Sequence, residues 1–173
     1  MNKLHLYTGD GKGKTTAAMG LALRSLGHGN RVLVAQFMKT GNSGELDALR
    51  RLGSVVMTAE PVRGFTFRMD DAQKACTRAE QAAFAGIVTA AVRREKPQTI
   101  VLDELGVALT TGMLPEETAR ALLAAALESG ETVTTGRAAP GWLEDMADYL
   151  SRIHAEKHPY ASEGLPARRG VEW

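Results

Sequence analysis

The feature that most constrains this chain is a glycine-rich stretch near its start, T-G-D-G-K-G-K-T-T, at residues 8–16. The apolar residues 4–7 before it predict a strand, and residues 17–23 after it predict a helix. Glycines here let successive backbone N–H groups turn toward an anion, and the positive end of the helix strengthens the attraction. The stretch is therefore predicted to be a phosphate-binding loop.

The residues of this loop have distinct expected roles. Lys14 is expected to contact phosphoryl oxygens, and the Thr15 hydroxyl is expected to bind Mg²⁺. The usual pattern, G-x-x-x-x-G-K-[S/T], requires a glycine where this chain has Thr8, so the cradle is one residue shorter. A shorter cradle is expected to hold a triphosphate in a different pose from that in ordinary ATPases. The alternative is a glycine-rich turn that binds no ligand. That alternative does not explain Lys-Thr-Thr at the helix start, because these residues are not needed for packing. The expected ATP contacts in the loop are Gly9, Asp10, Gly11, Lys12, Gly13, Lys14, Thr15 and Thr16.

Composition excludes several classes of protein. A length of 173 residues, with 44% hydrophobic and 24% charged residues, predicts a single globular domain over residues 1–173. The net charge of +1 argues against bulk electrostatic binding to nucleic acid or to an anionic membrane. No apolar run approaches the roughly 18 residues of a membrane span. A single cysteine, Cys76, and the lack of a signal-peptide pattern favour a cytoplasmic location.

Strands and helices alternate along the rest of the chain. Further strands are expected at residues 31–37, 55–57, 99–104, 131–135 and about 152–156, and helices at 14–26, 45–52, 77–96, 115–129 and 140–150. The third of these helices is placed by a capping box, T-R-A-E, at 77–80. The strands are continuously apolar, which indicates a parallel sheet covered on both faces. We expect an α/β fold of the P-loop NTPase type, an open, mostly parallel sheet of about six strands with its ligand at their carboxyl ends.

Four further side chains could carry chemistry at that edge. Asp103 and Glu104 end an apolar strand, which is the position of the acidic group that holds Mg²⁺ in many NTPases, although such a pair can also be a solvated turn. Arg137 follows the strand at 131–135 and could contact phosphate oxygens or form a surface ion pair. Lys39 lies just after the strand at 31–37. The long connection at 59–75 contains two phenylalanines. These could either anchor the loop to the core or have a functional role, because long loops in compact domains are often functional.

The chain resembles the P-loop family of ATP-dependent corrinoid adenosyltransferases. The likeness rests on the loop T-G-D-G-K-G-K-T-T, on Q-F-M-K at 36–39, on V-L-D-E-L at 101–105, on T-G-R at 135–137 and on the ending A-R-R-G-V-E-W. The shortened loop is itself typical of this family. The resemblance implies that a Co(I) corrinoid attacks the 5′ carbon of ATP and releases triphosphate, in cobalamin biosynthesis or salvage. The alternatives are a small P-loop kinase or NTPase, and a nucleotide-dependent regulatory module.

The resemblance also implies a set of functional residues and partners. ATP is expected to bind the loop and Arg137 in the reverse orientation to that in other P-loop proteins. The expected catalytic residues are Lys14, Thr15 and Glu104. Mg²⁺, or Mn²⁺, is expected on Thr15, Asp103 and Glu104. The corrinoid is either cob(I)alamin or cob(I)yrinic acid a,c-diamide, a reduced flavoprotein is the expected electron donor, and the protein is expected to be a homodimer. The residues expected to cover the corrin and to displace its lower axial base are Phe65, Thr66 and Phe67.

Overall fold

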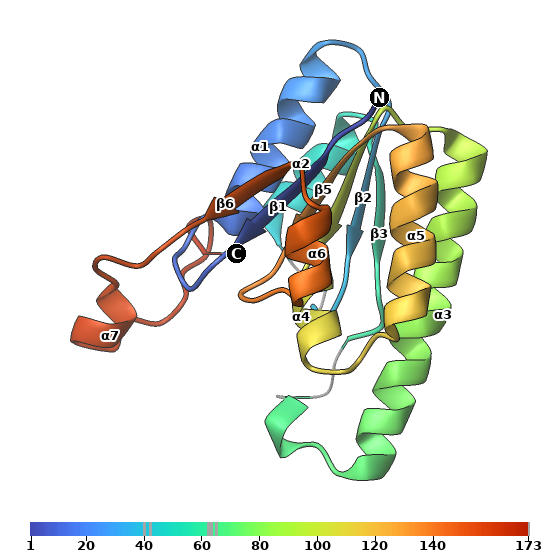
Figure 1. Cartoon of the computed structure of the whole chain (residues 1–173). Coiled ribbons are helices and arrows are strands. Elements are labelled where there is room, and N and C mark those ends of the chain that lie inside the picture. Colours follow the sequence, from blue (N-terminus) through green and yellow to red (C-terminus); the bar gives the residue numbers. More distant parts are fainter. Residues whose placement is uncertain (40, 42, 62–63, 65, 173) are drawn as a thin grey trace.

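The computed structural model of the chain describes residues 1–39, 41, 43–61, 64 and 66–172, and the account below concerns these residues. A six-stranded sheet with the order β3-β2-β4-β5-β1-β6 forms the centre of the molecule (Figure 1). All its neighbouring strands are parallel, which confirms the predicted α/β class. The strands are β1 (Leu4–Thr8), β2 (Val32–Gln36), β3 (Val55–Thr58), β4 (Thr99–Asp103), β5 (Glu131–Thr135) and β6 (Tyr149–Arg152).

Helices cover both faces of this sheet. Helices α1 and α2 pack on one face, while α3, α5 and α6 lie on the other (Figure 1). Among the described residues, no helix combines the length and the apolar content needed to span a membrane. The helical segments are α1 (Lys14–Gly27), α2 (Gly44–Arg51), η1 (Thr66–Arg68, a 3₁₀ turn), α3 (Asp71–Glu95), α4 (Leu105–Thr110), α5 (Glu116–Ser129), α6 (Gly141–Met146) and α7 (Pro159–Glu163).

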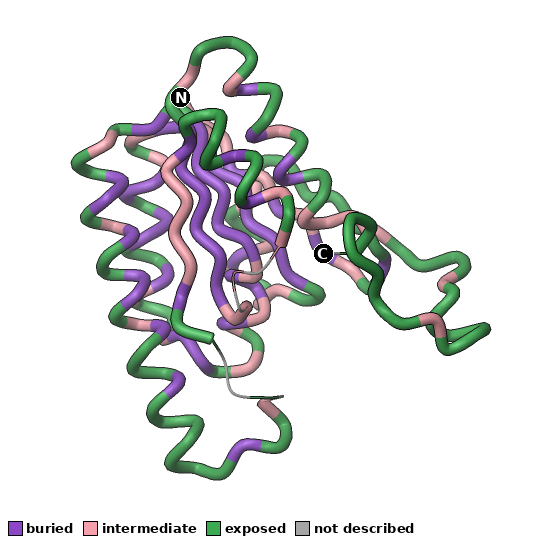
Figure 2. Tube along the Cα trace, turned by 180° about the vertical axis from the view of Figure 1, so that it is seen from behind, coloured by how far each residue is buried: buried purple, intermediate pink, exposed green. Residues whose placement is uncertain are grey.

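The core is built on two adjacent interior strands, β2 and β4, in which every residue is buried. Two apolar clusters, one on each face of the sheet, enclose them. Figure 2 shows the inner strands of the sheet coloured as buried. Strands buried on both faces are the reason that the sequence has continuous apolar runs instead of alternation. The carboxyl ends of β1, β2, β4 and β5 consequently meet at one rigid edge of the sheet.

The predicted start of the long helix was wrong. Helix α3 begins at Asp71, where the Asp70 carboxylate accepts the N–H of Gln73 and the Gln73 side chain accepts the N–H of Asp70. This capping box precedes the predicted one, and Thr77 lies buried within the helix. Both tetrapeptides fit the same pattern, but Thr77 faces inward, where its hydroxyl lies 3.9 Å from the sulfur of Met69. The helix therefore continues through residue 77.

The predicted helix at 140–150 was too long, and the strand after it began earlier than predicted. Helix α6 ends at Met146, and β6 pairs with the edge of β1. The N–H of Asp148 donates to the carbonyl of Leu4 at 2.9 Å, so pairing with the open sheet edge outweighs helix propensity. Met146 and Leu150 are exposed, whereas Leu143 is buried. The short helix α4 was not predicted.

Candidate functional site

The glycine-rich loop joins β1 to α1 and is tightly packed against the chain that follows β6. Gly9 has a φ of 108°, and a Cβ there would lie 2.3 Å from the carbonyl oxygen of Ile153. A Cβ on Gly11 would lie 2.7 Å from the carbonyl carbon of His154. The N–H of Gly9 donates to the carbonyl of Arg137 at 3.2 Å, and that of Gly11 to Ile153 at 2.8 Å. These two glycines thus fix the loop in place, and their N–H groups point into the protein.

The part of the loop whose geometry suits an anion is the start of α1. Gly13 caps this helix with a φ of 119° and makes no side-chain capping bond. The N–H groups of the first helical turn have no acceptor within the helix, and they carry its partial positive charge. The ammonium of Lys14 folds back and donates to the carbonyl of Gly11 at 2.6 Å. Burial lowers the pKa of Lys14. This arrangement suits a phosphate group.

Asp103, at the end of β4, is the centre of the polar network. One oxygen, Oδ1, accepts from the hydroxyls of Thr15 at 2.8 Å and Thr135 at 2.7 Å. The other, Oδ2, accepts from the amide of Gln36 at 2.9 Å and from the ammonium of Lys39 at 2.8 Å. Burial alone would raise the pKa of this inaccessible carboxyl, but the charge of Lys39 and the hydrogen bonds hold it below its ordinary value. Asp103 is therefore an ionised group that links four elements.

Two residues beside this network have left-handed backbone conformations, which residues other than glycine rarely adopt. Glu104 has a φ of 61° and Met38 a φ of 56°. Their backbone N–H groups are anchored, that of Glu104 by Thr135 at 2.9 Å and that of Met38 by Gln81 at 3.3 Å. Burial raises the pKa of the Glu104 carboxyl against the opposing charge of Lys39. Strained backbone of this kind persists where the surrounding contacts hold it, and it is frequent at functional sites.

The same edge of the sheet offers a set of ligands for a hard cation. The ammonium of Lys39 lies 2.8 Å from Asp103 Oδ2, 3.1 Å from Thr15 Oγ1 and 3.4 Å from Glu104 Oε1. A positive group is thus already stabilised at the point where these three oxygens converge. Mg²⁺ is usually held by one or two carboxylates together with substrate phosphates, so this donor set fits it. This set has only two carboxylates, and the described part of the chain contains no group of three or more His, Cys, Asp or Glu that could hold a metal ion.

Two cavities flank the start of α1. One, of about 670 Å³, lies between Thr15, the segment at 43–45 and the C-terminal residues 170–172. The other, of about 430 Å³, is bounded by Lys14, Glu104, Arg137 and α4. Both open at the carboxyl ends of the strands, where ligands bind in open α/β sheets.

Close backbone contacts shape the walls of these cavities. A Cβ on Gly106 would lie 2.6 Å from the carbonyl oxygen of Ala138, so the segment that follows β4 is in close contact with the segment that follows β5. In the C-terminal segment, hydrogen bonds from Arg168 to Glu172 lower the pKa of that glutamate to about 2. The Lys12 ammonium lies 4.0 Å from the same carboxylate. The end of the chain thus lies beside the loop, which the sequence did not predict.

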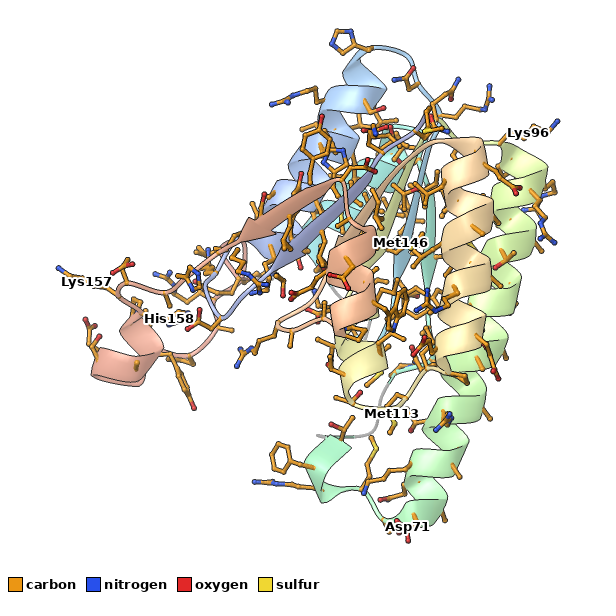
Figure 3. The ribbon with its side chains drawn as sticks, in the orientation of Figure 1. Asp71, Lys96, Met113, Met146, Lys157 and His158 are labelled. Atoms are coloured by element: carbon orange, nitrogen blue, oxygen red, sulfur yellow. The ribbon has the colours of Figure 1, made fainter. Side chains whose placement is uncertain are left out.

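The structure brings together one group of the predicted site residues and separates another. Lys14, Thr15, Asp103, Glu104 and Arg137 share one edge of the sheet. Of the residues expected to cover the corrin, Thr66 and Phe67 lie elsewhere, because η1 is beyond the strand ends, near the start of α3 that Asp71 marks (Figures 1 and 3).

Within that second group, Phe67 is 76% exposed, and the guanidinium of Arg68 lies 5.6 Å from its ring centre. Thr66 is only partly exposed. Phe65 lies outside the described residues. An exposed aromatic ring on a short turn offers a surface for a large apolar ligand.

Sequence reasoning missed three members of the Asp103 network. Gln36 and Thr135 were not assigned a role, and Lys39 was noted only for its position. The available signal was the placement of each polar side chain at the carboxyl end of an otherwise buried strand, or just after it. Neighbouring parallel strands bring such positions together.

Comparisons with known proteins agree on one family. The family model described as "ATP:corrinoid adenosyltransferase BtuR/CobO/CobP" matches residues 1–173. The corrinoid adenosyltransferase of Pseudomonas aeruginosa is 34% identical over 173 residues, covering 98% of this chain and 83% of that protein. The corrinoid adenosyltransferase CobA of Salmonella typhimurium is 33% identical over 172 residues, covering 97% and 84%. The corrinoid adenosyltransferase of Escherichia coli is 31% identical, with the same coverage.

Proposed function

The chain belongs to the ATP:corrinoid adenosyltransferase family, and on that premise we propose how its residues carry out the reaction. The protein is a transferase that moves the 5′-deoxyadenosyl group of ATP to the cobalt of a Co(I) corrinoid, in cobalamin biosynthesis or salvage. The cobalt electron pair forms a bond to the 5′ carbon, and the bond from that carbon to oxygen breaks. The leaving group is inorganic triphosphate, which carries away the bonding electrons.

The observation that best supports this role is the cationic start of α1 beside Asp103 and Glu104. Negative charge grows on the triphosphate as the carbon–oxygen bond breaks, so groups that hold it lower the barrier. The first-turn N–H groups of α1, the ammonium of Lys14 and the guanidinium of Arg137 are suited to this. Mg²⁺, when held by Thr15, Asp103 and Glu104, would neutralise further charge on the leaving group. No step needs an activated water, so ATP hydrolysis is a side reaction.

The short loop and the two cavities support an unusual placement of ATP. The phosphates belong beside Lys14 and Arg137, which line the 430 Å³ cavity. The larger cavity, beside Thr15 and the C-terminal segment, has room for the nucleoside. In this family a reversed nucleotide would direct the 5′ carbon toward an incoming corrinoid. Gly9 and Gly11 then act by holding the loop against residues 153 and 154.

The corrinoid is proposed to bind against η1. An exposed Phe67 there can cover the lower face of the corrin and exclude its axial base or water, which makes a Co(II) corrinoid easier to reduce. Thr66, and Phe65 outside the described residues, belong to the same proposal. Either cob(I)alamin or cob(I)yrinic acid a,c-diamide fits this role, because the contact involves the corrin ring.

Replacing Phe67 with Ala is expected to slow the reaction that starts from Co(II) by roughly tenfold or more, because most of an exposed aromatic contact area is lost. The reaction that starts from chemically prepared Co(I) is expected to change by less than about twofold, since that step needs no change of coordination. Adenosylcobalamin formation, followed with each starting oxidation state, measures the difference. Leu23→Ala, another exposed apolar residue, is the control. Equal losses from Co(II) and Co(I) would show that η1 does not control coordination.

The electron donor, domain organisation, location and oligomeric state of the protein are also proposals. A reduced flavoprotein supplies the electron, residues 1–173 act as one domain, and the protein works in the cytoplasm as a homodimer. The edge strand β6 lends support to association, because Tyr149 and Leu150 are 54% and 42% exposed beside an open sheet edge.

The reaction itself is tested by anaerobic turnover of the purified protein with ATP, Mg²⁺ and chemically reduced cob(I)alamin. The expected result is loss of the Co(I) absorbance and formation of adenosylcobalamin, which is recognised by its sensitivity to light. Omitting ATP is the control. An unchanged Co(I) spectrum in the presence of ATP and Mg²⁺ would contradict the proposed reaction.

A further inference from the structure

The ammonium of Lys39 occupies the position proposed for the metal ion. Its nitrogen lies within 3.4 Å of oxygens from Thr15, Asp103 and Glu104, which are the three proposed ligands. Two cations cannot share this space, because like charges a few ångströms apart repel strongly in a partly buried site. Lys39 and Mg²⁺ are therefore alternatives at one point of the structure.

The position of Lys39 is built into the fold. The residue before it, Met38, has a φ of 56°, and its N–H is held by Gln81. One residue earlier, Phe37 is fully buried, and its N–H donates to the carbonyl of Asp103 at 2.9 Å. The chain thus leaves β2 along a fixed path that returns the Lys39 side chain over β4. About one third of this side chain is exposed, at 34%, so a route outward is open to it.

We propose that Lys39 is an internal counter-ion that keeps the metal position occupied until ATP arrives with Mg²⁺. In the nucleotide-free protein its ammonium neutralises Asp103 and Glu104, so a free divalent cation binds weakly. When Mg²⁺ enters with the triphosphate, the ammonium moves outward, where phosphate oxygens can accept its hydrogen bonds. Lys39 is thus a positioning residue that makes metal binding depend on the nucleotide. This inference rests on the proposed metal site and goes beyond the transfer reaction.

Removing the charge tests this directly. Mn²⁺, which can be followed by electron paramagnetic resonance, is titrated without nucleotide into the wild type, Lys39→Met and the control Lys74→Met, in which an exposed lysine of α3 is changed. The Kd for Mn²⁺ is expected to fall by about tenfold or more in Lys39→Met alone, because a competing cation has been removed from the ligands. Weak binding in all three proteins, with Lys39→Met folded by circular dichroism, would overturn the proposal.

A second measurement observes Lys39 itself in the wild-type protein, so it tests the proposal even if Lys39→Met does not fold. Lysines are labelled by reductive ¹³C-methylation, and the Lys39 signal is identified by its absence in Lys39→Arg. Addition of Mg²⁺ with inorganic tripolyphosphate is expected to shift that signal, while the Lys74 signal stays in place. An unmoved Lys39 signal at saturation would overturn the proposal. Neither experiment involves a corrinoid or turnover, so failure here is distinct from failure of adenosyl transfer.

Discussion

Replacing Lys14 with Ala is expected to reduce adenosyl transfer by about 10²- to 10³-fold or more, the effect of removing one preorganised charged donor from a developing anion. The ammonium of Lys14 already lies over the loop, 2.6 Å from the carbonyl of Gly11, and it lines the cavity that also contains Glu104 and Arg137. Its loss removes positive charge where the triphosphate gains negative charge. Initial rates of adenosylcobalamin formation at saturating ATP measure the effect.

The fold is expected to survive this substitution. The bond from Lys14 is to a loop carbonyl, whereas the loop itself is held by the backbone bonds of Gly9 and Gly11. The thermal unfolding midpoint of Lys14→Ala should stay within about 3 °C of the wild type, since it loses no buried apolar contact. Lys74→Ala is the control for both measurements. Near-normal turnover by Lys14→Ala would show that the loop takes no part in the mechanism.

Replacing Asp103 with Ala is expected to lower the free energy of unfolding by about 3 kcal/mol or more, because buried donors lose their acceptor. Gln36 and Thr135 are each 1% exposed, and their donors would lose the acceptor that Asp103 provides, while Lys39 can turn toward water. Urea unfolding measures this loss. Asp47→Ala, which breaks an exposed ion pair with Arg50, is the control, and it should cost less than about 1 kcal/mol. An equal effect in both variants would show that the Asp103 network does not stabilise the fold.

The stabilisation by Asp103 should also depend on pH. The pKa of this carboxyl is lowered in the folded protein from its ordinary value of 3.8, so its contribution is complete above that value. As pH falls through the still lower folded pKa, the carboxylate is protonated and the contribution is lost. The difference in unfolding free energy between wild type and Asp103→Ala should therefore be constant near neutral pH and should narrow in strong acid. A difference that grows on acidification would contradict this sign.

The sheet and the glycine-rich loop between β1 and α1 were predictable from sequence because their signals are local. The loop residues 8–16 are contiguous, and β2 and β4 are continuous apolar runs that only a doubly covered parallel sheet buries. The carboxylates of Asp103 and Glu104 were placed correctly at the end of a strand for the same reason. The glycine-rich loop and the apolar strands can each be recognised from the residues of a single continuous segment.

The errors occurred where the outcome depends on distant contacts. The residues at 147–150 fit a helix pattern, but Asp148 donates a hydrogen bond to Leu4, and β6 begins at Tyr149, paired with the open edge of β1. The sequence at 77–80 fits a capping box, yet Asp70 and Gln73 form one seven residues earlier. Neither choice can be read from local pattern alone, because each is made by packing against another element.

The polar network around Asp103 was partly hidden for a related reason. Gln36 and Lys39 come from the end of β2 and Thr135 from the end of β5, and their meeting at Asp103 depends on the order β2-β4-β5 in the sheet. Sequence order does not give this arrangement. The exchange of a lysine ammonium for a metal ion can be inferred only from the distances.

The phosphorus product of the anaerobic reaction is the most direct test of the central claim that the loop holds a leaving group. After turnover with ATP, Mg²⁺ and cob(I)alamin, ³¹P nuclear magnetic resonance is expected to show inorganic triphosphate in amounts equal to the adenosylcobalamin formed. ADP or single phosphate as the only products, with the corrinoid unchanged, would instead identify a kinase or an NTPase and contradict this account.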